Sequence, residues 1–242
     1  AMFCPIMMIY DDEDLSNFVK GCKKENLFEV NFEDKIHNVY KINDIEIVNH
    51  IKESIKNQTL VIADGHHRYE TCLSIRNYYN KAGQKKAGSE YALVFFVDKN
   101  DGLALMPIHR LIKKINIDDF RQKIYNYFEI SDDFDYDIVM YDGKFTYLKY
   151  IDKNSKDLID KLDVKLFENI VFKKMLNLSD EDIANNEISG YAHSKEEVIK
   201  SVDRKEAVVG FLLKPVTYES LFEITKNNLT FPQKSTYFYP KI

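Results

Sequence analysis

The segment LVIADGHHRYETCL, from Leu60 to Leu73, gathers acidic, imidazole and guanidinium side chains at a predicted join between a strand and a helix. The apolar run Leu60 to Ala63 predicts a short buried strand, and Gly65 permits a tight turn that other residues resist. Beyond the turn, helical spacing predicts one shared face, formed by Tyr69, Cys72, Leu73 and Tyr79. The polar residues Asp64 to Glu70 therefore lie where the strand ends and the helix begins.

A helix that begins directly after such a turn favours an anion at its start. Its first backbone N–H groups have no partner within the helix, and that end carries a partial positive charge. Arg68 adds a planar, permanently charged donor, and His66 and His67 add further donors. We therefore predict an anion site, suited to phosphate, at Gly65, His66, His67 and Arg68.

Structural roles for the same residues are the alternative. Asp64 can cap the helix, as short acidic side chains commonly do, and Arg68 can pair with Asp64 or Glu70. One histidine can also be purely structural. Each role is common by itself, but a cap does not require Asp, Gly, two His, Arg and Glu within seven positions, so the motif as a whole favours a functional anion or metal site.

A metal site would use Asp64, His66, His67 and Glu70. His66 and Glu70 lie four positions apart and would share a helix face, but the motif lacks the two-histidine helical spacing of zinc proteases. Metal-dependent hydrolysis therefore ranks below phosphate binding. Mg²⁺ stays compatible, with Asp64 as its ligand, because one or two carboxylates plus substrate phosphates usually hold this ion.

Two further segments carry polar residues that can join the site. His109 and Arg110 are adjacent on a predicted apolar strand, Met106 to Ile112, so they point to opposite faces and one should face inward or toward a cleft. A strand-end histidine and a solvated arginine are the alternative. The tail from Pro232 to Pro240 predicts either a loop that clamps a phosphate or a terminal strand held by its aromatic residues; its polar residues are Gln233, Lys234, Ser235 and Thr236.

Composition excludes several classes of function. The net charge of −5, with no dense Lys/Arg block, disfavours nucleic acid or an anionic membrane as the main partner. No run approaches the roughly 20 apolar residues of a membrane span, and Met2 to Tyr10 is too short for a signal peptide, which predicts a cytoplasmic protein. The three cysteines lack metal-ligand spacing and predict reduced thiols, with Cys72 in the core.

Apolar periodicity predicts an α/β or α+β fold, a mixed sheet with flanking helices. We predict two subdomains, 1–115 and 116–242, with no Pro/Gly/Ser linker at the boundary, and one continuous domain is the alternative. Strands are predicted at 5–10, 28–32, 39–42, 60–63, 91–97, 103–112, within 128–151 as a pair, and at 207–213, with 91–97 and 103–112 central in the sheet. Helices are predicted from about residue 15 to 22, 45 to 55 and 66 to 79, and at 117–128, 164–176, 195–202 and 216–225.

Three ordered motifs give the chain a resemblance to the domain of unknown function 1015 family. These are IADGHHRYET at Ile62 to Thr71, a Pro-x-His-Arg strand at Pro107 to Arg110, and QKSTYFYPK at Gln233 to Lys241. Together they span almost the whole chain. The resemblance also implies that longer members carry an N-terminal region that precedes the part seen here.

The Asp-Gly-x-His-Arg core is also similar to the phosphate-binding loop of the ParB and sulfiredoxin superfamily, which includes free-serine kinases. This shorter resemblance implies a ParB/sulfiredoxin-like core in which Asp64, Gly65, His67 and Arg68 hold nucleotide phosphates, with His66 at the variable position. The upstream acidic residue that the small serine kinases use for catalysis has no clear counterpart.

The leading hypothesis is a nucleotide-binding phosphotransferase, with ATP or ADP as donor and free serine as a candidate acceptor. Amides after Gly65 and the side chains of His66, His67 and Arg68 would hold phosphates, Asp64 would hold Mg²⁺ and act with Glu70, the candidate base. Four residues from the other segments would complete the pocket, namely His109, Arg110, Lys234 and Ser235. A non-catalytic module that senses a nucleotide or another small anion is the alternative, and a metal-dependent hydrolase is the third.

Overall fold

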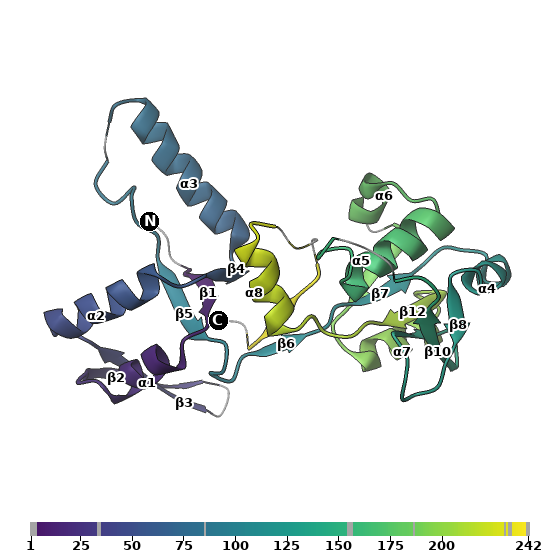
Figure 1. Cartoon of the computed structure of the whole chain (residues 1–242), viewed down its shortest axis with the longest axis horizontal. Helices are drawn as coiled ribbons and strands as arrows, with labels where there is room; N and C mark the ends of the chain where they lie inside the picture. Colours follow the sequence, from purple (N-terminus) through teal and green to yellow (C-terminus); the bar gives the residue numbers. More distant parts are fainter. Residues whose placement is uncertain are drawn as a thin grey trace. The chain divides into compact units, whose positions relative to one another are not determined.

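The computed structural model describes residues 4–32, 35–84, 86–153, 157–185, 187–229, 231 and 234–240. Its contacts divide the chain into two compact units, the first ending at Leu103 and the second beginning at Ala104. Both units combine helices with sheets (Figure 1). The predicted mixed fold class is confirmed.

Unit 1 contains five strands and three helices among its described residues. They are β1 (Ile6–Tyr10), α1 (Glu13–Gly21), β2 (Glu25–Phe32), β3 (Lys35–Lys41), α2 (Ile45–Lys56), β4 (Val61–Asp64), α3 (His66–Lys81) and β5 (Val94–Asp98).

A three-stranded sheet in the order β4-β1-β5 organises unit 1. The central strand β1 runs antiparallel to β4 and parallel to β5, and all five of its residues are buried. This burial explains its unbroken apolar sequence, IMMIY, because a strand covered on both faces needs no polar alternation. Strands β2 and β3 form a separate hairpin.

Short acidic side chains begin the first two helices. The Asp12 carboxylate accepts a hydrogen bond from the Leu15 N–H at the start of α1. The Asp44 carboxylate accepts from the Glu46 and Ile47 N–H groups at the start of α2. Each cap satisfies backbone donors that the first helical turn leaves unpaired.

Unit 2 contains eight strands and five α-helices among its described residues, with one π-helix, η1. They are β6 (Ala104–Met106), β7 (His109–Ile112), α4 (Ile117–Ile124), β8 (Phe128–Ile130), β9 (Ile138–Tyr141), β10 (Phe145–Tyr150), α5 (Asp163–Phe167), η1 (Glu168–Met175), α6 (Asp180–Asn185), β11 (Ser189–Ala192), α7 (Lys195–Asp203), β12 (Val209–Leu212), α8 (Tyr218–Lys226) and β13 (Tyr237–Tyr239).

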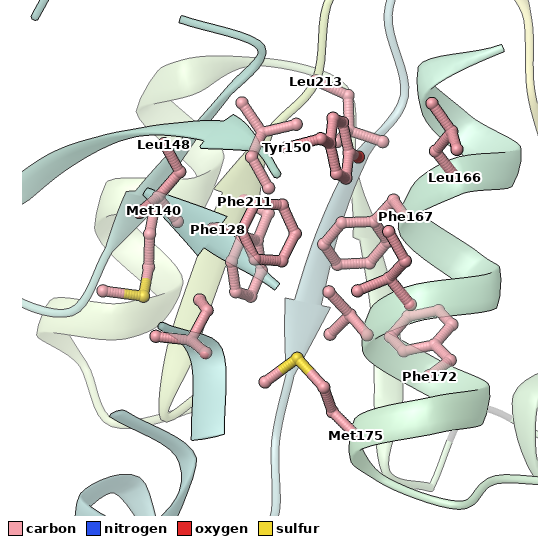
Figure 2. Close-up of a cluster of buried hydrophobic side chains, with 14 of the residues drawn as sticks. Phe128, Met140, Leu148, Tyr150, Leu166, Phe167, Phe172, Met175, Phe211 and Leu213 are labelled. Carbon is pink, nitrogen blue, oxygen red and sulfur yellow. The ribbon is translucent and has the colours of Figure 1, made fainter. Parts of the chain in front are cut away.

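A six-stranded sheet, ordered β11-β7-β12-β9-β10-β8, carries the main hydrophobic core of unit 2. On one face, side chains of these strands meet those of α4, α5, η1 and α8. Figure 2 shows Phe167, Phe172 and Met175 from the helices facing Phe128 and Phe211 from the strands. The rings of Phe167 and Phe172 meet edge to face at 5.2 Å, a geometry that adds about 0.5–1.5 kcal/mol to area burial. The opposite face packs against α7.

The structure corrects the strand predicted from residue 103 to 112. Pro107 interrupts it, because proline has no N–H to donate to a ladder. The two pieces join different sheets: β6 pairs with β13 of the tail, and β7 lies between β11 and β12. Strand β5 is likewise an edge strand of its sheet, whereas residues 91–97 were expected to be central.

Other elements also differ from the sequence prediction. The helix expected at 164–176 changes to π geometry at Glu168, the strand pair expected within 128–151 is three strands, and α6 and β11 were not predicted. The predicted subdomain boundary at residues 115 and 116 falls between β7 and α4, inside unit 2, because β7 pairs with strands of that unit. No helix in the described part of the chain has the length and apolar composition to cross a bilayer.

Candidate functional site

The predicted join lies between β4, which ends at Asp64, and α3, which begins at His66. Gly65 between them adopts φ 91° and ψ 28°, a left-handed conformation that glycine accepts at no steric cost. Because Gly65 is also the N-cap, no side chain caps the helix. Asp64 therefore does not serve as the N-cap, which excludes one of the structural alternatives.

Arg68 ties this turn to the sheet of unit 1. Its Nη2 donates to the Asp64 carboxylate at 2.5 Å and its Nη1 donates to the Pro5 carbonyl at 2.6 Å. The guanidinium lies against Gly65, since a Cβ built there would stand 2.8 Å from the Arg68 Nε. The pairing of Arg68 with Asp64 is thus one structural alternative that the geometry confirms, and it fixes both charges at the helix start.

The first backbone amides of α3 face this same region. The first N–H with a helical partner is that of Tyr69, which donates to the Gly65 carbonyl at 3.0 Å. The N–H groups of His66, His67 and Arg68 precede it and have no acceptor within the helix. Three backbone donors and a guanidinium therefore meet within one helical turn, as an anion site requires.

His67 and Glu70 lie on the exposed side of the same turn. The His67 imidazole is fully exposed and its Nδ1 lies 3.5 Å from the Glu70 Oε2, while the Glu70 side chain is 71% exposed. His66 is exposed as well. Glu70 therefore contacts a neighbouring imidazole and leaves the backbone amides open to a ligand.

A cavity of about 1160 Å³ runs beside α3 from this turn. It is large enough for a nucleotide, since small-molecule pockets span roughly 300–1,000 Å³. Residues at the spacing of one helical face form one wall, namely His67, Thr71, Ser74, Ile75 and Tyr78. The opposite wall comes from the segment after the helix, with Lys86, Gly88, Ser89 and Tyr91. Figure 1 shows α3 extending away from the sheet of unit 1.

The helix that forms this wall is poorly buried. None of its side chains is in the buried class, and Tyr78 is 70% exposed. Cys72, expected in the core, is only half-buried and lines the cavity. The aromatic and polar side chains of α3 are thus available to a ligand.

The structure does not assemble a transition-metal site from the motif. No group of three His, Cys, Asp or Glu side chains suited to a metal ion occurs among the described residues. The Asp64 carboxylate is engaged by Arg68, and Glu70 by His67. His67 and Glu70 contact each other, but no third candidate ligand joins them among the described residues.

Arg110 lies in unit 2 and is fully buried. It donates to the carbonyls of Ile108 at 2.9 Å and Lys234 at 3.1 Å, lies 3.4 Å from the Glu168 carboxylate, and stacks 4.9 Å from the Tyr191 ring centroid. Burial lowers the pKa of Arg110, and Glu168 opposes that shift. The alternative of a solvated arginine is therefore wrong, and the Arg110 Nε has no hydrogen-bond partner among the described residues.

His109 is buried as well, so both residues of the pair face protein. Its Nδ1 accepts a hydrogen bond from the Leu213 N–H at 3.2 Å. Burial, and after it the charge of Arg110, lowers the pKa of His109 to about 4. His109 is therefore neutral at physiological pH and supplies no positive charge to an anion.

The tail contains the terminal strand, which was one of its two predicted alternatives, and the phosphate-clamping loop stays a prediction. Residues 237–239 form β13, the terminal strand, while Lys234 adopts a left-handed φ of 57° with its side chain exposed and Ser235 is buried. Pro232 and Gln233 lie outside the described residues. Lys234, Ser235, His109 and Arg110 belong to unit 2 and the DGHHR turn to unit 1, so a shared pocket stays a prediction.

Sequence reasoning missed Glu168 and Tyr191, the side chains that accompany Arg110. Glu168 begins η1, ENIVFKKM, and its side chain is only 12% exposed; an acid buried to that degree indicates a basic partner. Tyr191 lies on β11, which pairs with β7 so that Tyr191 stands opposite Arg110. Both residues contact Arg110 across a long sequence separation, so the spacing of residues along the chain does not predict these contacts.

Residues 1–165 match the model of a family described as "Protein of unknown function (DUF1015)". Among solved structures, the chain is similar to a free serine kinase in complex with AMP (17% identity, TM-score 0.44, covering 96% of this chain and 83% of that one). It is also similar to a mutant free serine kinase in complex with ADP (17%, 0.42, 96% and 83%) and to a conserved hypothetical protein from Pyrococcus furiosus (18%, 0.45, 98% and 88%). No curated protein gives a significant match.

Proposed function

The chain belongs to the DUF1015 family of proteins of unknown function, and we propose that it binds the phosphates of a nucleotide at the start of α3 and transfers a phosphoryl group to a small hydroxyl acceptor. The observation that carries this proposal is the uncapped first turn of α3, where three backbone amides and Arg68 meet at one end of a nucleotide-sized cavity. A phosphate would accept from the three amides, which no side chain caps, and the Arg68 guanidinium beside them would add positive charge.

The cavity gives the rest of a nucleotide a place to lie. With phosphates at His67 and Arg68, the sugar and base would extend along α3 toward Tyr78 and Tyr91. Exposed aromatic rings suit a heterocyclic base, because stacking tolerates any base and contributes about 1–3 kcal/mol. The walls thus favour a nucleotide over inorganic phosphate.

The transfer itself would use few protein groups. The acceptor hydroxyl oxygen forms a bond to the terminal phosphorus as the bond from that phosphorus to the leaving nucleotide oxygen breaks, and the hydroxyl proton passes to Glu70. His67 lies beside Glu70 and can bind the transferred group. Free serine is the first acceptor to test, because the Asp-Gly-x-His-Arg motif is similar to the phosphate loop of free-serine kinases.

Mg²⁺ fits this arrangement through Asp64. Its carboxylate stands at the same turn and is 39% exposed, and Mg²⁺ usually needs only one or two carboxylates besides phosphate oxygens. When bound, the ion would neutralise phosphate charge. Arg68 holds the Asp64 carboxylate in place for that role.

Calorimetry with AMP, ADP and ATP tests the binding step. Arg68→Ala should lower the affinity for the tightest-binding nucleotide about 10- to 150-fold, because a hydrogen bond to a charged group contributes roughly 1.5–3 kcal/mol. Arg76→Ala is the matched control, since Arg76 is exposed on the same helix and outside the cavity lining. Equal affinity in the wild type and Arg68→Ala would remove Arg68 from the site.

His67→Ala keeps binding testable if Arg68→Ala fails to fold. The His67 side chain is fully exposed, so its removal leaves the anchor between Arg68 and Pro5 intact. A loss of nucleotide affinity in a folded His67→Ala variant supports the site. Unchanged affinity in that variant contradicts the assigned role of His67.

Glu70→Gln separates catalysis from binding. It keeps the shape but cannot accept a proton, so turnover with serine should fall roughly 10²- to 10⁴-fold while nucleotide affinity barely changes. Should the wild type bind nucleotide without turnover, the second candidate, a nucleotide-sensing module, replaces the phosphotransferase. The high exposure of Glu70 favours this candidate, because a side chain that is 71% exposed is not held in one position relative to a reacting hydroxyl.

A further inference from the structure

A second hollow lies on the face of the unit 2 sheet that α7 covers in part. Leu212, Val139 and Tyr147 stand directly opposite one another on β12, β9 and β10, so their side chains share that face. The helix packs on neighbouring residues through the buried Val198. The side chains of Leu212, Val139 and Tyr147 border a hollow of about 180 Å³, which Lys195 in the first turn of α7 also lines.

Aromatic rings and two ammonium groups line this hollow. The Lys195 Nζ lies 4.6 Å from the centroid of the Phe145 ring, and the Lys214 Nζ lies 4.7 Å from that of Tyr136. The rings of Tyr136 and Tyr147 lie beside them, with centroids 5.2 Å apart and planes tilted by 57°. The two lysines come from different elements, the first position of α7 and the segment after β12, yet both line one hollow.

Neither lysine forms a close ion pair within the described part of unit 2, while Lys214 donates to the Tyr136 carbonyl and interacts at longer range with Asp135 and Asp163. No described carboxylate lies within 4.0 Å of either ammonium. The nearby Asp135 pairs with Lys149 at 2.5 Å, and the Glu197 carboxylate accepts the His193 N–H at 2.6 Å. The first turn of α7 also carries Glu196 and Glu197, so the two lysines, and not the helix start, supply the positive charge that lines the hollow.

We propose that this hollow binds a small, flat organic carboxylate. The carboxylate would lie between the ammonium groups of Lys195 and Lys214, and the flat apolar body against Tyr136 and Tyr147. The volume lies below the roughly 300–1,000 Å³ of pockets for larger ligands, which excludes a nucleotide. The aromatic lining favours a ligand with a planar body over a bare inorganic anion. This site is independent of the one at α3.

Titration with benzoate, followed by two-dimensional NMR, tests the proposal. Benzamide serves as the neutral ligand of the same shape, and acetate as the anion without a ring. We expect benzoate to shift the resonances of Tyr136, Phe145 and Leu212, with an affinity about tenfold higher than that of either comparison ligand, equivalent to about 1.4 kcal/mol.

Lysine variants decide whether charge is responsible. Lys195→Gln and Lys214→Gln should each weaken the binding of benzoate roughly three- to tenfold, because each removes one of the two cations that line the hollow. Lys200→Gln, on the same helix but outside the hollow, should leave affinity unchanged. All three side chains are exposed, so the variants should retain the wild-type spectrum. Absence of binding, equal binding of benzamide, or shifts confined to other residues would overturn the proposal.

Discussion

Replacement of Gly65 by alanine tests whether the turn before α3 is built around Arg68. Two costs are expected. An alanine in the left-handed conformation at φ 91° destabilises the turn by about 1–2 kcal/mol. Its Cβ would also stand 2.8 Å from the Arg68 Nε and 2.9 Å from Nη2, too close for the guanidinium to stay where it is.

The second cost follows from what the guanidinium holds. To make room, Arg68 must leave the Asp64 carboxylate or the Pro5 carbonyl, bonds that contribute about 1.5–3 kcal/mol each when a charged group is involved. The Arg68 side chain is 31% exposed, so water recovers part of this loss. We therefore expect Gly65→Ala to destabilise the turn by about 2–4 kcal/mol in total.

Gly83→Ala provides the matched control. Gly83 also has a positive φ, 66°, but nothing lies within 4 Å of a Cβ placed there. It should therefore show only the conformational cost, about 1–2 kcal/mol. Native-state hydrogen exchange of the β4 and α3 amides measures both variants locally, and nucleotide affinity should fall for Gly65→Ala alone. Equal destabilisation by the two variants would refute the role given to Arg68.

Two further predictions concern unit 2. His109→Asn keeps an acceptor for the Leu213 N–H but cannot bind a proton. The pKa of His109 is lowered from 6.5 to about 4 in the folded chain, so the unfolded chain takes up the proton first as the pH falls. Only the wild type should therefore lose about 2.5 kcal/mol of unfolding free energy through this group between pH 7.5 and pH 4.5. Urea unfolding at both pH values measures this, and parallel losses in the two proteins would contradict it. Arg110→Met removes the donor to the Lys234 carbonyl and the partner of Glu168, and should destabilise unit 2 by about 3–5 kcal/mol and speed amide exchange across residues 234–240. Unchanged exchange there would show that Arg110 does not hold the tail.

Local signals in the sequence were sufficient for the elements around the site. The apolar run before Asp64, the glycine turn and the helical spacing after it predict β4, the left-handed residue and α3 closely, because each depends on neighbouring residues. The caps at Asp12 and Asp44 likewise depend only on neighbouring residues. The pairing of Arg68 with Asp64 was also foreseeable, since residues four apart meet at a helix start.

Features set by distant contacts could not be predicted in this way. The burial of Arg110 depends on Glu168 and on the carbonyl of Lys234, far along the chain. Strand β11, with the sequence SGYA, has too little apolar alternation to indicate a strand and forms because β7 offers it an edge. The break at Pro107 had a local signal, but the apolar residues on both sides of it outweighed that signal in the prediction.

Because α3 is sparsely buried, a ligand bound at its first turn can stabilise the whole helix. With no side chain in the buried class, the helix is held to unit 1 chiefly through its first turn, and a peptide helix of about 15 residues is marginal in water without such support. A phosphate that binds the free amides binds only the helical form, so by mass action it opposes unwinding. Helix formation in α3 and occupancy of its N-terminus are then one coupled equilibrium, in which each promotes the other.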